Sequence, residues 1–539
     1  MLRLTEIKLP LDHPEAALPA AIVTRLGIAP DAVLRWNVFK RSYDARKRQA
    51  IHLIYTVDVE LEDEAAVEAR APAHVTRTPD MRYRFVAHAP AGLTERPIVI
   101  GMGPCGLFAA LILAQMGFRP IVLERGKAVR ERTRDTFGLW RGGVLDPESN
   151  VQFGEGGAGT FSDGKLWSQV KDRTHYGRKV LEEFVLAGAP EEILFVAKPH
   201  IGTFRLVSMV EKMRATIEGL GGEIRFGCRV EDIAIDEGRV TGLRLASGET
   251  LACRHVVLAI GHSARDTFEM LHARGVHVEA KPFSIGFRIE HPQSLIDRAR
   301  FGDYAGHALL GAADYRLVHH CRNGRAVYSF CMCPGGTVVA ATSEAGRVVT
   351  NGMSQYSRNE RNANAGLVVG ITPEDYPGSP LAGIAFQRLW EARAFELGGG
   401  DYSAPGQRVG DFLAGRPSRE WGSVIPSYTP GVKPTDLGGA APDYAIAALR
   451  EALPALDRQL RGFALPDAVL TAVETRTSSP IRIRRGEDHQ SINTRGLYPA
   501  GEGAGYAGGI YSAAIDGIEV AQALALDLLD GTVDRSRVS

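Results

Sequence analysis

Residues 97–106, Pro-Ile-Val-Ile-Gly-Met-Gly-Pro-Cys-Gly, join an apolar run to a G-x-G-x-x-G turn, and residues 121–126, Ile-Val-Leu-Glu-Arg-Gly, end a second apolar run in an acid. In a strand–helix–strand unit, Gly101 permits the tight turn, Gly103 lets the backbone approach a pyrophosphate, and Gly106 lets the helix pack closely on the sheet. The N-terminus of that helix supplies N–H donors and a positive dipole end. The pattern therefore predicts a unit that binds the ADP half of a dinucleotide.

The acid that closes this unit is Glu124, which follows Gly101 by about the 20 residues that such a unit requires. We expect its carboxylate to accept hydrogen bonds from the ribose hydroxyls. The alternative for the motif is a glycine-containing turn in another kind of α/β unit. Residues 97–118 carry no charge, but they hold four glycines and two prolines, so we expect no membrane segment here.

Length and composition indicate a globular protein of several domains. The chain has 539 residues, which favours two or three domains, and Lys plus Arg equals Asp plus Glu at 63 each. This balance gives the whole chain no attraction to nucleic acid or to an anionic membrane. Residues 40–48 carry a local basic patch, which is either a solvated strand edge or a nucleic-acid contact. Since no apolar signal segment opens the sequence, we expect a cytoplasmic location.

The six cysteines form no disulfide framework and show no C-x-x-C or zinc-finger spacing, so reduced thiols are expected. Cys331 and Cys333 are the one close pair, within the run Cys-Met-Cys-Pro-Gly-Gly. This pair is either a redox-active or substrate-facing thiol site or an apolar pair at a strand end. The sequence leaves both interpretations open.

The chain divides into four expected segments, and the fold class is α/β. Residues 1–90 predict a separate ferredoxin-like α+β module, which a proline-rich connector follows. Residues 96–265 predict the first part of a Rossmann-like dinucleotide-binding domain. Residues 266–490 predict an inserted mixed-sheet substrate or cap domain, and residues 491–539 return to the dinucleotide-binding domain.

Two further glycine-rich loops accompany the first. Residues 153–166 interleave glycines with aromatic residues, which favours a loop packed against a ligand over a flexible surface loop. Residues 498–510 hold the second loop, and residues 511–529 are expected to form one long helix. Between residues 223 and 246 three strand-like runs predict a meander, which returns to a buried parallel strand at residues 255–261.

Three pieces together resemble the FAD-binding domain of the glutathione-reductase superfamily: the first glycine turn with Glu124, the strand that ends in Ala259-Ile-Gly261, and the C-terminal Ala500-Gly-Glu502. They occur in the order which that fold requires. The resemblance implies that the first loop holds the FAD pyrophosphate and that the acid holds the adenosine ribose. It also implies that the last motif places an acid near the ribityl-pyrophosphate linkage, with its helix aimed at the flavin ring. This chain has Glu502 where aspartate is commoner.

More narrowly, the chain resembles a bacterial family of FAD-dependent dehydrogenases whose substrate is generally unassigned. The resemblance rests on residues 153–166, 331–336, 474–480 and 501–517, and it covers nearly the whole chain. It implies an oxidoreductase with noncovalent FAD and no metal ligands, and it brings no particular reaction with it. The residues expected to contact the cofactor are Gly101, Gly103, Pro104, Gly106, Glu124, Arg125, Gly157, Gly159, Thr160, Val230, Gly261, Gly501, Glu502, Gly508, Gly509 and Ile510.

Flavin chemistry requires donors near the ring that stabilise the reduced anion. The helix that begins near Ile510 is expected to supply unpaired N–H groups, with Gly508 and Gly509 allowing a close approach; alternatively, these glycines only turn the chain. Two residues are catalytic candidates on the substrate side. Arg476 suits a carboxylate, and His291 suits proton transfer because histidine titrates near working pH. The alternative for each is a structural role in a sheet edge or an ion pair.

The expected function is that of an FAD-dependent oxidoreductase, a dehydrogenase or reductase, which moves a hydride or electrons between a small organic substrate and bound FAD. The glycine string recurs at residues 154–159 and 503–508, but neither copy opens a unit closed by an acid. This argues against a dedicated NAD(P)H domain and leaves transient NAD(P)H or another redox partner as electron donor. Three alternatives stay open: a flavin-dependent monooxygenase, an RNA-modifying flavoprotein that uses the basic residues 40–48, and a noncatalytic flavin-binding protein. We expect neither nucleic acid nor a membrane as partner, and the sequence does not define the substrate or the oligomeric state.

Overall fold

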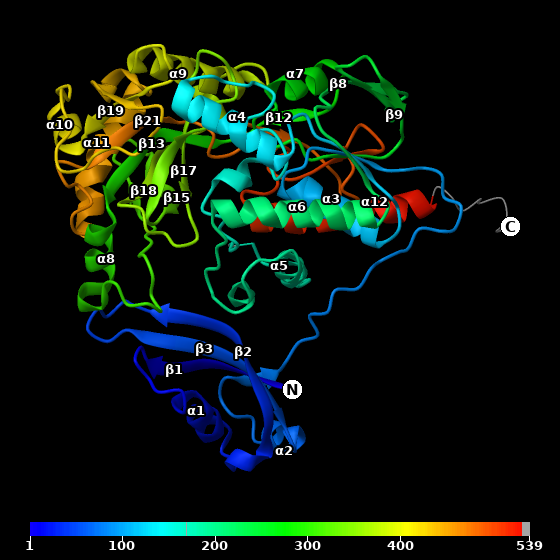
Figure 1. Ribbon diagram of the computed structural model, residues 1–539, viewed down its shortest axis with the longest axis vertical. Coiled ribbons are helices and arrows are strands. Elements are labelled where there is room, and N and C mark those ends of the chain that lie inside the picture. The colour runs from blue at the N-terminus through cyan, green and yellow to red at the C-terminus, as the bar shows by residue number, and fades with distance from the viewer. Residues whose placement is uncertain (169, 531–539) are drawn as a thin grey trace.

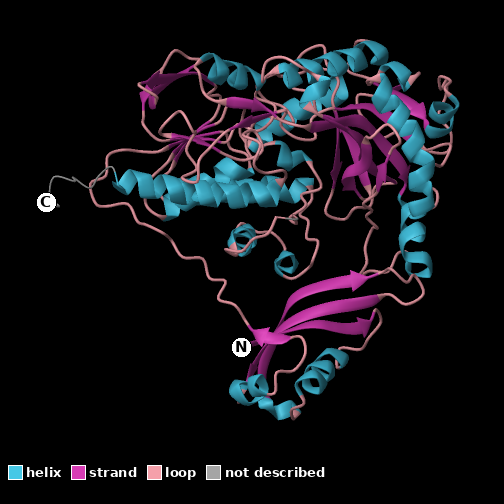
Figure 2. Ribbon diagram, turned by 180° about the vertical axis from the view of Figure 1, so that it is seen from behind, coloured by secondary structure: helices cyan, strands magenta, loops and turns pink. Residues whose placement is uncertain are grey.

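The computed structural model describes residues 1–168 and 170–530 of the chain. Figure 1 shows an N-terminal sheet at one end of the molecule, a helix-rich region around α3 and α12, and a region built on the strands β13, β18 and β21. Seen from behind, the N-terminal strands form a layer of their own (Figure 2). Among the described helices, none combines the length and the apolar character needed to cross a bilayer.

The N-terminal module has the element order of a split βαβ unit, in which all neighbouring strands are antiparallel. Its sheet order is β2-β3-β1-β4. Alternate residues of β1 and β3 are buried, because one face of the sheet packs on the two helices. The elements are β1 (Leu2–Pro10), α1 (Ala17–Leu26), β2 (Val33–Asp44), β3 (His52–Leu61), α2 (Glu64–Ala69) and β4 (Val75–Arg77).

The module is attached to the rest of the molecule by its β2–β3 hairpin. The N–H of Arg41 donates to the carbonyl of Phe195 at 2.6 Å, and the N–H of Ala197 donates to the carbonyl of Arg41 at 2.9 Å. Tyr43 packs edge-on against the buried ring of Phe301, with ring centroids 5.7 Å apart. The unit expected to be separate therefore has its own sheet but shares packing with the body of the protein.

The central region is a five-stranded parallel sheet of order β23-β11-β5-β6-β7. The chain builds outward from β5 on one side and then returns to β11 on the other, so a topological switch point lies between β5 and β11. The five strands are β5 (Ile98–Ile100), β6 (Ile121–Leu123), β7 (Glu223–Arg225), β11 (Val256–Leu258) and β23 (Leu497–Pro499).

Two long helices cross closely beside this sheet. They are α3 (Pro104–Gln115), which links β5 to β6, and α12 (Ile510–Asp530). A Cβ on Gly517 would lie 2.3 Å from the carbonyl oxygen of Cys105, so the contact requires glycine at this crossing. A Cβ on Gly106 would likewise lie 2.0 Å from the carbonyl oxygen of Gly101, which explains the third glycine of the motif.

The expected meander differs from the observed one in its first strand. Residues Glu223–Arg225 pair in parallel with β6 and so belong to the central sheet, because a run of three residues carries no pattern that distinguishes the two sheets. The meander is instead formed by β8 (Val230–Asp236), β9 (Arg239–Leu245) and β10 (Thr250–Ala252), in the order β10-β9-β8.

Between β6 and β7 the chain forms three helices and the glycine-rich loop of residues 153–166. The helices are α4 (Val129–Gly142), α5 (Tyr176–Leu186) and α6 (Thr203–Gly219). The loop is packed rather than flexible, since the fully buried Arg132 of α4 donates to the carbonyls of Asn150, Val151 and Glu155, each at 2.7 Å. A buried arginine at the centre of a glycine loop fixes the path of its backbone.

The third region is built on a mixed seven-stranded sheet of order β14-β15-β18-β13-β21-β19-β20. Only β19 and β20 are parallel to each other, and the other neighbours are antiparallel. Along the sheet order the strands are β14 (Val318–His320), β15 (Ala326–Cys333), β18 (Asn362–Ile371), β13 (Phe283–Pro292), β21 (Val469–Glu474), β19 (Ala404–Arg408) and β20 (Val432–Pro434).

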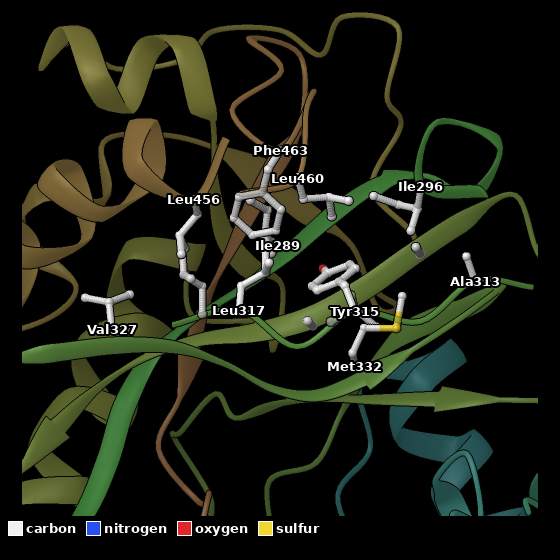
Figure 3. Close-up of a cluster of buried hydrophobic side chains, with 14 of the residues drawn as sticks. Ile289, Ile296, Ala313, Tyr315, Leu317, Val327, Met332, Leu456, Leu460 and Phe463 are labelled. Carbon is white, nitrogen blue, oxygen red and sulfur yellow. The ribbon is translucent and has the colours of Figure 1, made fainter. Parts of the chain in front are cut away.

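Two small sheets and five helices complete this region. The paired strands are β12 (Val278–Ala280) with β22 (Ile481–Ile483), and β16 (Gly336–Ala340) with β17 (Thr350–Ser354). The helices are α7 (Arg265–Ala273), α8 (Gln293–Phe301), α9 (Ala382–Gly398), α10 (Val409–Ala414) and α11 (Asp443–Gln459). Buried side chains from β13, β15 and α11 meet in one apolar cluster, in which Ile289, Tyr315 and Phe463 lie close together (Figure 3).

Candidate active site

A cavity of about 820 Å³ lies at the carboxyl ends of β5, β11 and β23. Gly101, Ala259 and Ala500, each the first or second residue after one of these strands, line it. In an open parallel sheet, ligands bind outside the carboxyl ends of the strands at the switch point. The volume lies within the range that small-molecule and cofactor pockets have.

Glycines bring two backbone segments into contact at the wall of this cavity. Gly101 has φ +94°, and a Cβ there would lie 2.4 Å from the carbonyl oxygen of Ala259. Gly157 has φ +62°, and a Cβ there would lie 2.7 Å from the Cα of Gly103. The loop of residues 153–166 therefore touches the Gly101–Pro104 turn by backbone alone, which leaves the peptide groups of both segments open to a ligand.

Two helices begin at the cavity. Pro104 is the first residue of α3 and Ile510 is the first residue of α12, and both line the cavity. The first N–H groups of a helix have no partner within the helix, and no side chain caps α3. These N–H groups and the positive ends of two helix dipoles make this part of the cavity suitable for phosphate or for a developing negative charge.

Glu124 ties three loops together. Its Oε2 accepts from the N–H of Met102 at 2.8 Å, and its Oε1 accepts from the N–H groups of Gly126 and Gly154, both at 2.9 Å. A carboxylate has about four acceptor positions. The carboxylate therefore positions both glycine loops and retains one acceptor position for a ribose hydroxyl.

Arg125 lines the cavity, but its guanidinium is held by carboxylates. It donates to Glu148 at 2.9 Å and to Asp266 at 2.9 Å, and it lies 4.1 Å from the centre of the Phe153 ring. A contact from this residue to a cofactor would come from its stem or from the stacked ring beside it.

Most of the residues predicted for the cofactor are brought together. Those that line the cavity are Gly101, Gly103, Pro104, Glu124, Arg125, Gly157, Gly159, Val230, Gly261, Gly501, Glu502, Gly508, Gly509 and Ile510. Gly106 and Thr160 lie behind its wall: Gly106 packs α3 against the Gly101 turn, and the buried Thr160 packs under Gly156. Their contribution is to the shape of the loops, and they do not line the cavity.

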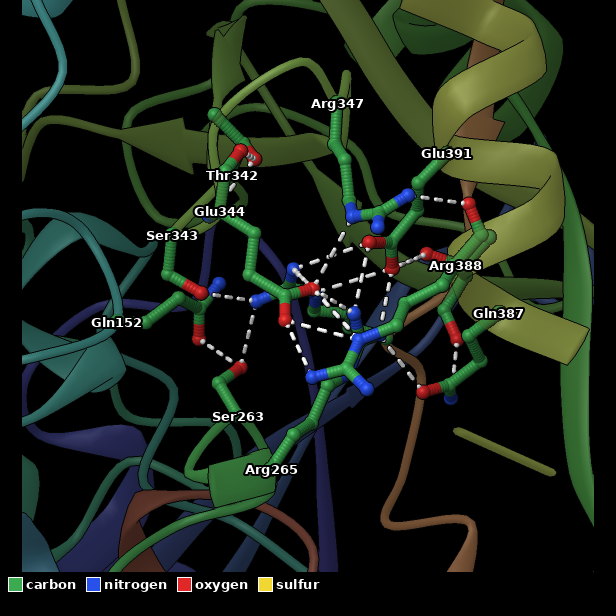
Figure 4. Close-up of polar contacts among 12 residues, drawn as sticks. Gln152, Ser263, Arg265, Thr342, Ser343, Glu344, Arg347, Gln387, Arg388 and Glu391 are labelled. Atoms are coloured by element: carbon green, nitrogen blue, oxygen red, sulfur yellow. Dashed lines mark hydrogen bonds and ion pairs between the residues drawn. The ribbon is translucent and has the colours of Figure 1, made fainter. Parts of the chain in front are cut away.

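Arg476 also lines the cavity, but its guanidinium belongs to a buried ionic cluster. It donates to Glu391 from Nε at 3.2 Å and from Nη2 at 3.1 Å, and from Nη1 to the hydroxyls of Ser343 at 2.6 Å and Ser263 at 3.0 Å. Glu391 at the same time accepts two hydrogen bonds from Arg265, at 2.7 and 2.9 Å. Figure 4 shows Arg265, Glu391 and the neighbouring Glu344 within this network. The geometry matches the structural alternative for Arg476 and leaves it few donors for a substrate.

His291 is not brought to the cavity. Its ring is fully buried, its Nε2 lies 2.7 Å from the carbonyl oxygen of Phe463, and burial lowers its pKa to about 4. Its ring centroid lies 4.9 Å from that of Phe463, which belongs to the apolar cluster of Figure 3. The structure gives this histidine no route for proton transfer to a ligand in the cavity.

The far side of the cavity is formed by residues that we did not predict for the site. Lys165 lies near the end of the glycine-rich loop of residues 153–166, donates to the carbonyl of Met332 and lies 3.3 Å from the buried Asp163. Lys198 pairs with Asp314 at 2.6 Å. The position of Lys165 within the glycine-rich loop is a sequence signal, whereas Lys198 has no motif around it.

Glu502 lies at the wall of the cavity and has an unusual environment. The described residues give its carboxylate no hydrogen bond, and burial raises its pKa to about 7, with Lys281 opposing this and Cys331 adding to it. The acid that the resemblance places near the cofactor is therefore neutral over much of the acidic range.

Comparisons with known proteins agree on a flavin enzyme. A family model described as FAD-dependent protein, C-terminal domain-like, matches residues 282–477, and one described as FAD dependent oxidoreductase matches residues 196–316. A domain of unknown function matches residues 1–60.

Relatives and solved structures were also found. A protein of Clostridium beijerinckii, described as uncharacterized, is 47% identical over 526 residues, which cover 97% of this chain and 98% of that protein. A phytoene desaturase (neurosporene-forming) of Cereibacter sphaeroides is 27% identical over 213 residues, covering 32% of this chain and 41% of that protein. A structure of the halogenase PltM in complex with FAD has 12% identity and a TM-score of 0.39, and covers 81% of this chain and 70% of that chain.

The fold, the cavity and the family matches define the class of this protein: it is an FAD-dependent oxidoreductase. The chain belongs to the same family as the Clostridium beijerinckii protein, with which it aligns over nearly its whole length.

Proposed function

We propose that the cavity binds FAD noncovalently and that the enzyme acts as a dehydrogenase or reductase on a small organic substrate. One observation carries this proposal. The same cavity is lined by the glycine loops and helix N-termini of the central region and by Tyr328, Phe330 and Met332 from β15 of the third region. A cofactor held by the first set would face a substrate held by the second.

The residues present fit FAD. The Gly101–Pro104 turn and the N-terminus of α3 would hold the pyrophosphate, because backbone N–H groups and a dipole end meet there. Glu124 would accept from the adenosine ribose with its open acceptor position. Residues 501–502 and the N-terminus of α12 would lie near the ribityl chain and the ring. Bound FAD would supply the two-electron redox chemistry that acts on the substrate.

The substrate side carries an excess of accessible positive charge. Arg316 is exposed at the cavity and has no ion pair or hydrogen bond among the described residues. Lys198 lies beside it on the cavity wall, half-exposed and paired with Asp314. We infer that the substrate carries a carboxylate or a phosphate, which Arg316 would bind by a two-pronged contact. This assigns to Arg316 the role that the sequence suggested for Arg476.

The electron donor is proposed to be transient NAD(P)H or another redox partner. The described part of the chain forms one all-parallel sheet with a glycine fingerprint closed by an acid. The loop of residues 153–166, which repeats the glycine string, packs on the Gly103 turn of that fingerprint. A nicotinamide cofactor would then bind briefly at the open side of the cavity.

The visible absorbance spectrum of the purified protein, before and after anaerobic addition of excess NADPH, tests this function. Oxidised-flavin bands that bleach support a nicotinamide-linked oxidoreductase. If the bands persist with NADPH but bleach with a substrate, the proposed dehydrogenase stands and NADPH is not its electron donor. If reconstitution with FAD gives no bands, the proposed cofactor site is wrong. Hydroxylated product formed in step with oxygen uptake would favour the monooxygenase alternative.

A further inference from the structure

Cys331 and Cys333 lie at the end of β15, where the strand is irregular. The pairing of β15 with β18 shifts register between Phe330 and Cys333, and Cys331 has φ +41°. In a regular strand, residues two apart face the same side about 6.6 Å apart, which is at the upper limit for the Cα atoms of a disulfide. A bulged backbone shortens that separation, and the Cys333 thiol turns back to donate to the carbonyl oxygen of Cys331 at 3.4 Å.

Cys331 faces the cofactor side of the cavity. Cys331 and Met332 line the cavity together with Gly501, Glu502 and Ile510. Cys331 is close enough to Glu502 to raise the pKa of that carboxyl group. Cys331 therefore lies across from the segment proposed to hold the ribityl chain and the flavin ring, whereas its neighbour Cys333 is buried and does not line the cavity.

Two cations hold the backbone at residues 331 and 332. Arg288 donates to the carbonyl of Cys331 at 2.9 Å, and Lys165 donates to the carbonyl of Met332. Arg288 is completely buried and binds both oxygens of Glu474 at 2.8 Å.

The charge around the pair does not cancel without a thiolate. The ionised groups of this cluster are three cations and two carboxylates, namely Lys165, Arg288, Arg358, Asp163 and Glu474. One positive charge is left over, and where the nearby Glu502 is neutral a thiolate at Cys331 would balance it. His200, which also faces Asp163 and Arg358, adds no charge because burial lowers its pKa.

The pKa of the Cys331 thiol differs accordingly from those of the cysteines outside the pair. The Cys333 thiol, and then Lys165 and Arg288, hold the pKa of Cys331 well below its usual range, although burial opposes them. Burial raises the pKa of every cysteine outside the pair: Cys105, Cys228, Cys253 and Cys321. A thiolate beside a protonated thiol is the arrangement that thiol–disulfide chemistry uses, whereas an apolar pair at a strand end would need no cations around it.

We propose that Cys331 and Cys333 are a redox-active dithiol that exchanges two electrons with FAD in the cavity. The proposal rests on the proposed function. In the oxidative direction the Cys331 thiolate and the Cys333 thiol together would lose two electrons and one proton, so that the S–H bond of Cys333 breaks and an S–S bond forms. The two electrons and the proton that leave the thiols go to oxidised flavin, giving the reduced flavin anion. In the reverse direction reduced flavin returns two electrons to the disulfide, and the pair stores or passes on electrons from the substrate.

The test counts electrons in the FAD-loaded, full-length protein. The protein is oxidised with ferricyanide, desalted and titrated anaerobically with dithionite while flavin absorbance is followed. Wild type is expected to take up two electrons for each FAD and two more for the disulfide. Cys331→Ser and Cys333→Ser are expected to lose the second pair, whereas Cys228→Ser, a cavity thiol without a cysteine neighbour, is expected to keep it.

A second measurement does not depend on the variants or on turnover. Oxidised and dithionite-treated wild type are denatured, alkylated with iodoacetamide and mapped by mass spectrometry. We expect Cys331 and Cys333 to be protected together in the oxidised sample and labelled together after reduction. Bound FAD with uptake of only two electrons and labelled thiols in the oxidised sample would overturn the dithiol and leave the proposed function intact. A protein that binds no FAD would instead refute the proposed function.

Discussion

Replacing Glu391 by glutamine tests whether Arg476 belongs to the framework of the cavity. Glu391 lies on α9, is completely buried, and accepts from Arg265 and Arg476 and from the hydroxyl of Thr475 at 2.8 Å. Burial alone would raise the pKa of Glu391, but the two arginines hold it well below its ordinary value. The substitution keeps the shape of the side chain and removes the charge between two buried cations.

The size of the effect follows from what replaces the lost charge. Removing one partner of a buried ion pair costs about 3–5 kcal/mol, because the other charge stays buried without compensation. Arg265 keeps its contact with Glu344, whereas Arg476 is 4.0 Å from Glu344 and loses its main partner. Because one of the two cations remains compensated, we expect the lower end of this range, a loss of about 3 kcal/mol in the free energy of unfolding.

Urea-induced unfolding at several pH values is the assay, followed by tryptophan fluorescence. The folded-state pKa of Glu391 is depressed, so its stabilisation is fully present above the unfolded pKa of about 4.3 and is lost as the pH falls towards the folded value. The difference between wild type and Glu391→Gln should therefore be constant from about pH 6 to 8 and shrink below about pH 4.

The control is Glu396→Gln on the same helix. Glu396 is exposed and pairs with Arg393 at 3.1 Å, and an exposed pair of this kind contributes little. A loss below about 1 kcal/mol for Glu391→Gln, or a loss equal to that of the control, would refute the buried-cluster reasoning. Arg476 would then be available for substrate.

Three further predictions address the cofactor site, its acid and the N-terminal module. Gly157→Ala should lower the amount of FAD bound per protein at least tenfold. The control is Gly415→Ala, because Gly415 has a similar φ of +66° and no atom near the added Cβ, and this variant should retain FAD. Equal FAD content in the two variants would argue against the glycine contact. Burial raises the folded pKa of Glu502 to about 7, so charging it disfavours the folded state as the pH rises. The melting temperature of Glu502→Gln should accordingly equal that of wild type at pH 4 and exceed it at pH 8. A difference independent of pH would contradict this. Tyr43→Ala should remove an aromatic contact with Phe301 worth about 0.5–1.5 kcal/mol and so speed proteolysis of the connector that follows the N-terminal module. The control Trp36→Ala changes an exposed ring and should not speed it. Unchanged cleavage of Tyr43→Ala would mean that the contact with Phe301 does not hold the hairpin.

The parts of the site that the sequence predicted are those whose chemistry is local. Gly101, Gly103 and Glu124 lie within one strand–helix–strand unit, so spacing alone relates them, and the structure places all three at the cavity. The C-terminal Gly501 and Glu502 could be placed by the same logic, since they follow a strand and precede a helix.

The catalytic candidates were harder to judge because residue type gives the chemistry and not the partner. Arg476 suits a carboxylate, but Glu391, which occupies it, lies on a helix far away in the sequence. His291 faces the apolar cluster because it lies on a central strand that is buried on both faces, where alternation carries no information. Arg132 gave no signal at all, since a charged residue in an amphipathic helix is typical of a solvated face.

The N-terminal module contacts the segment that leads to Lys198 at the cavity wall. The hairpin edge at Arg41 pairs with residues 195–197, and the next residue, Lys198, is part of the cavity wall and pairs with Asp314. Asp314 also acts on Tyr43, whose pKa burial raises to about 12. Since backbone pairing fixes position more firmly than an exposed ion pair, the module holds the Lys198 segment in place at the substrate side. We propose that the module contributes to the shape of the site without supplying a residue that lines the cavity.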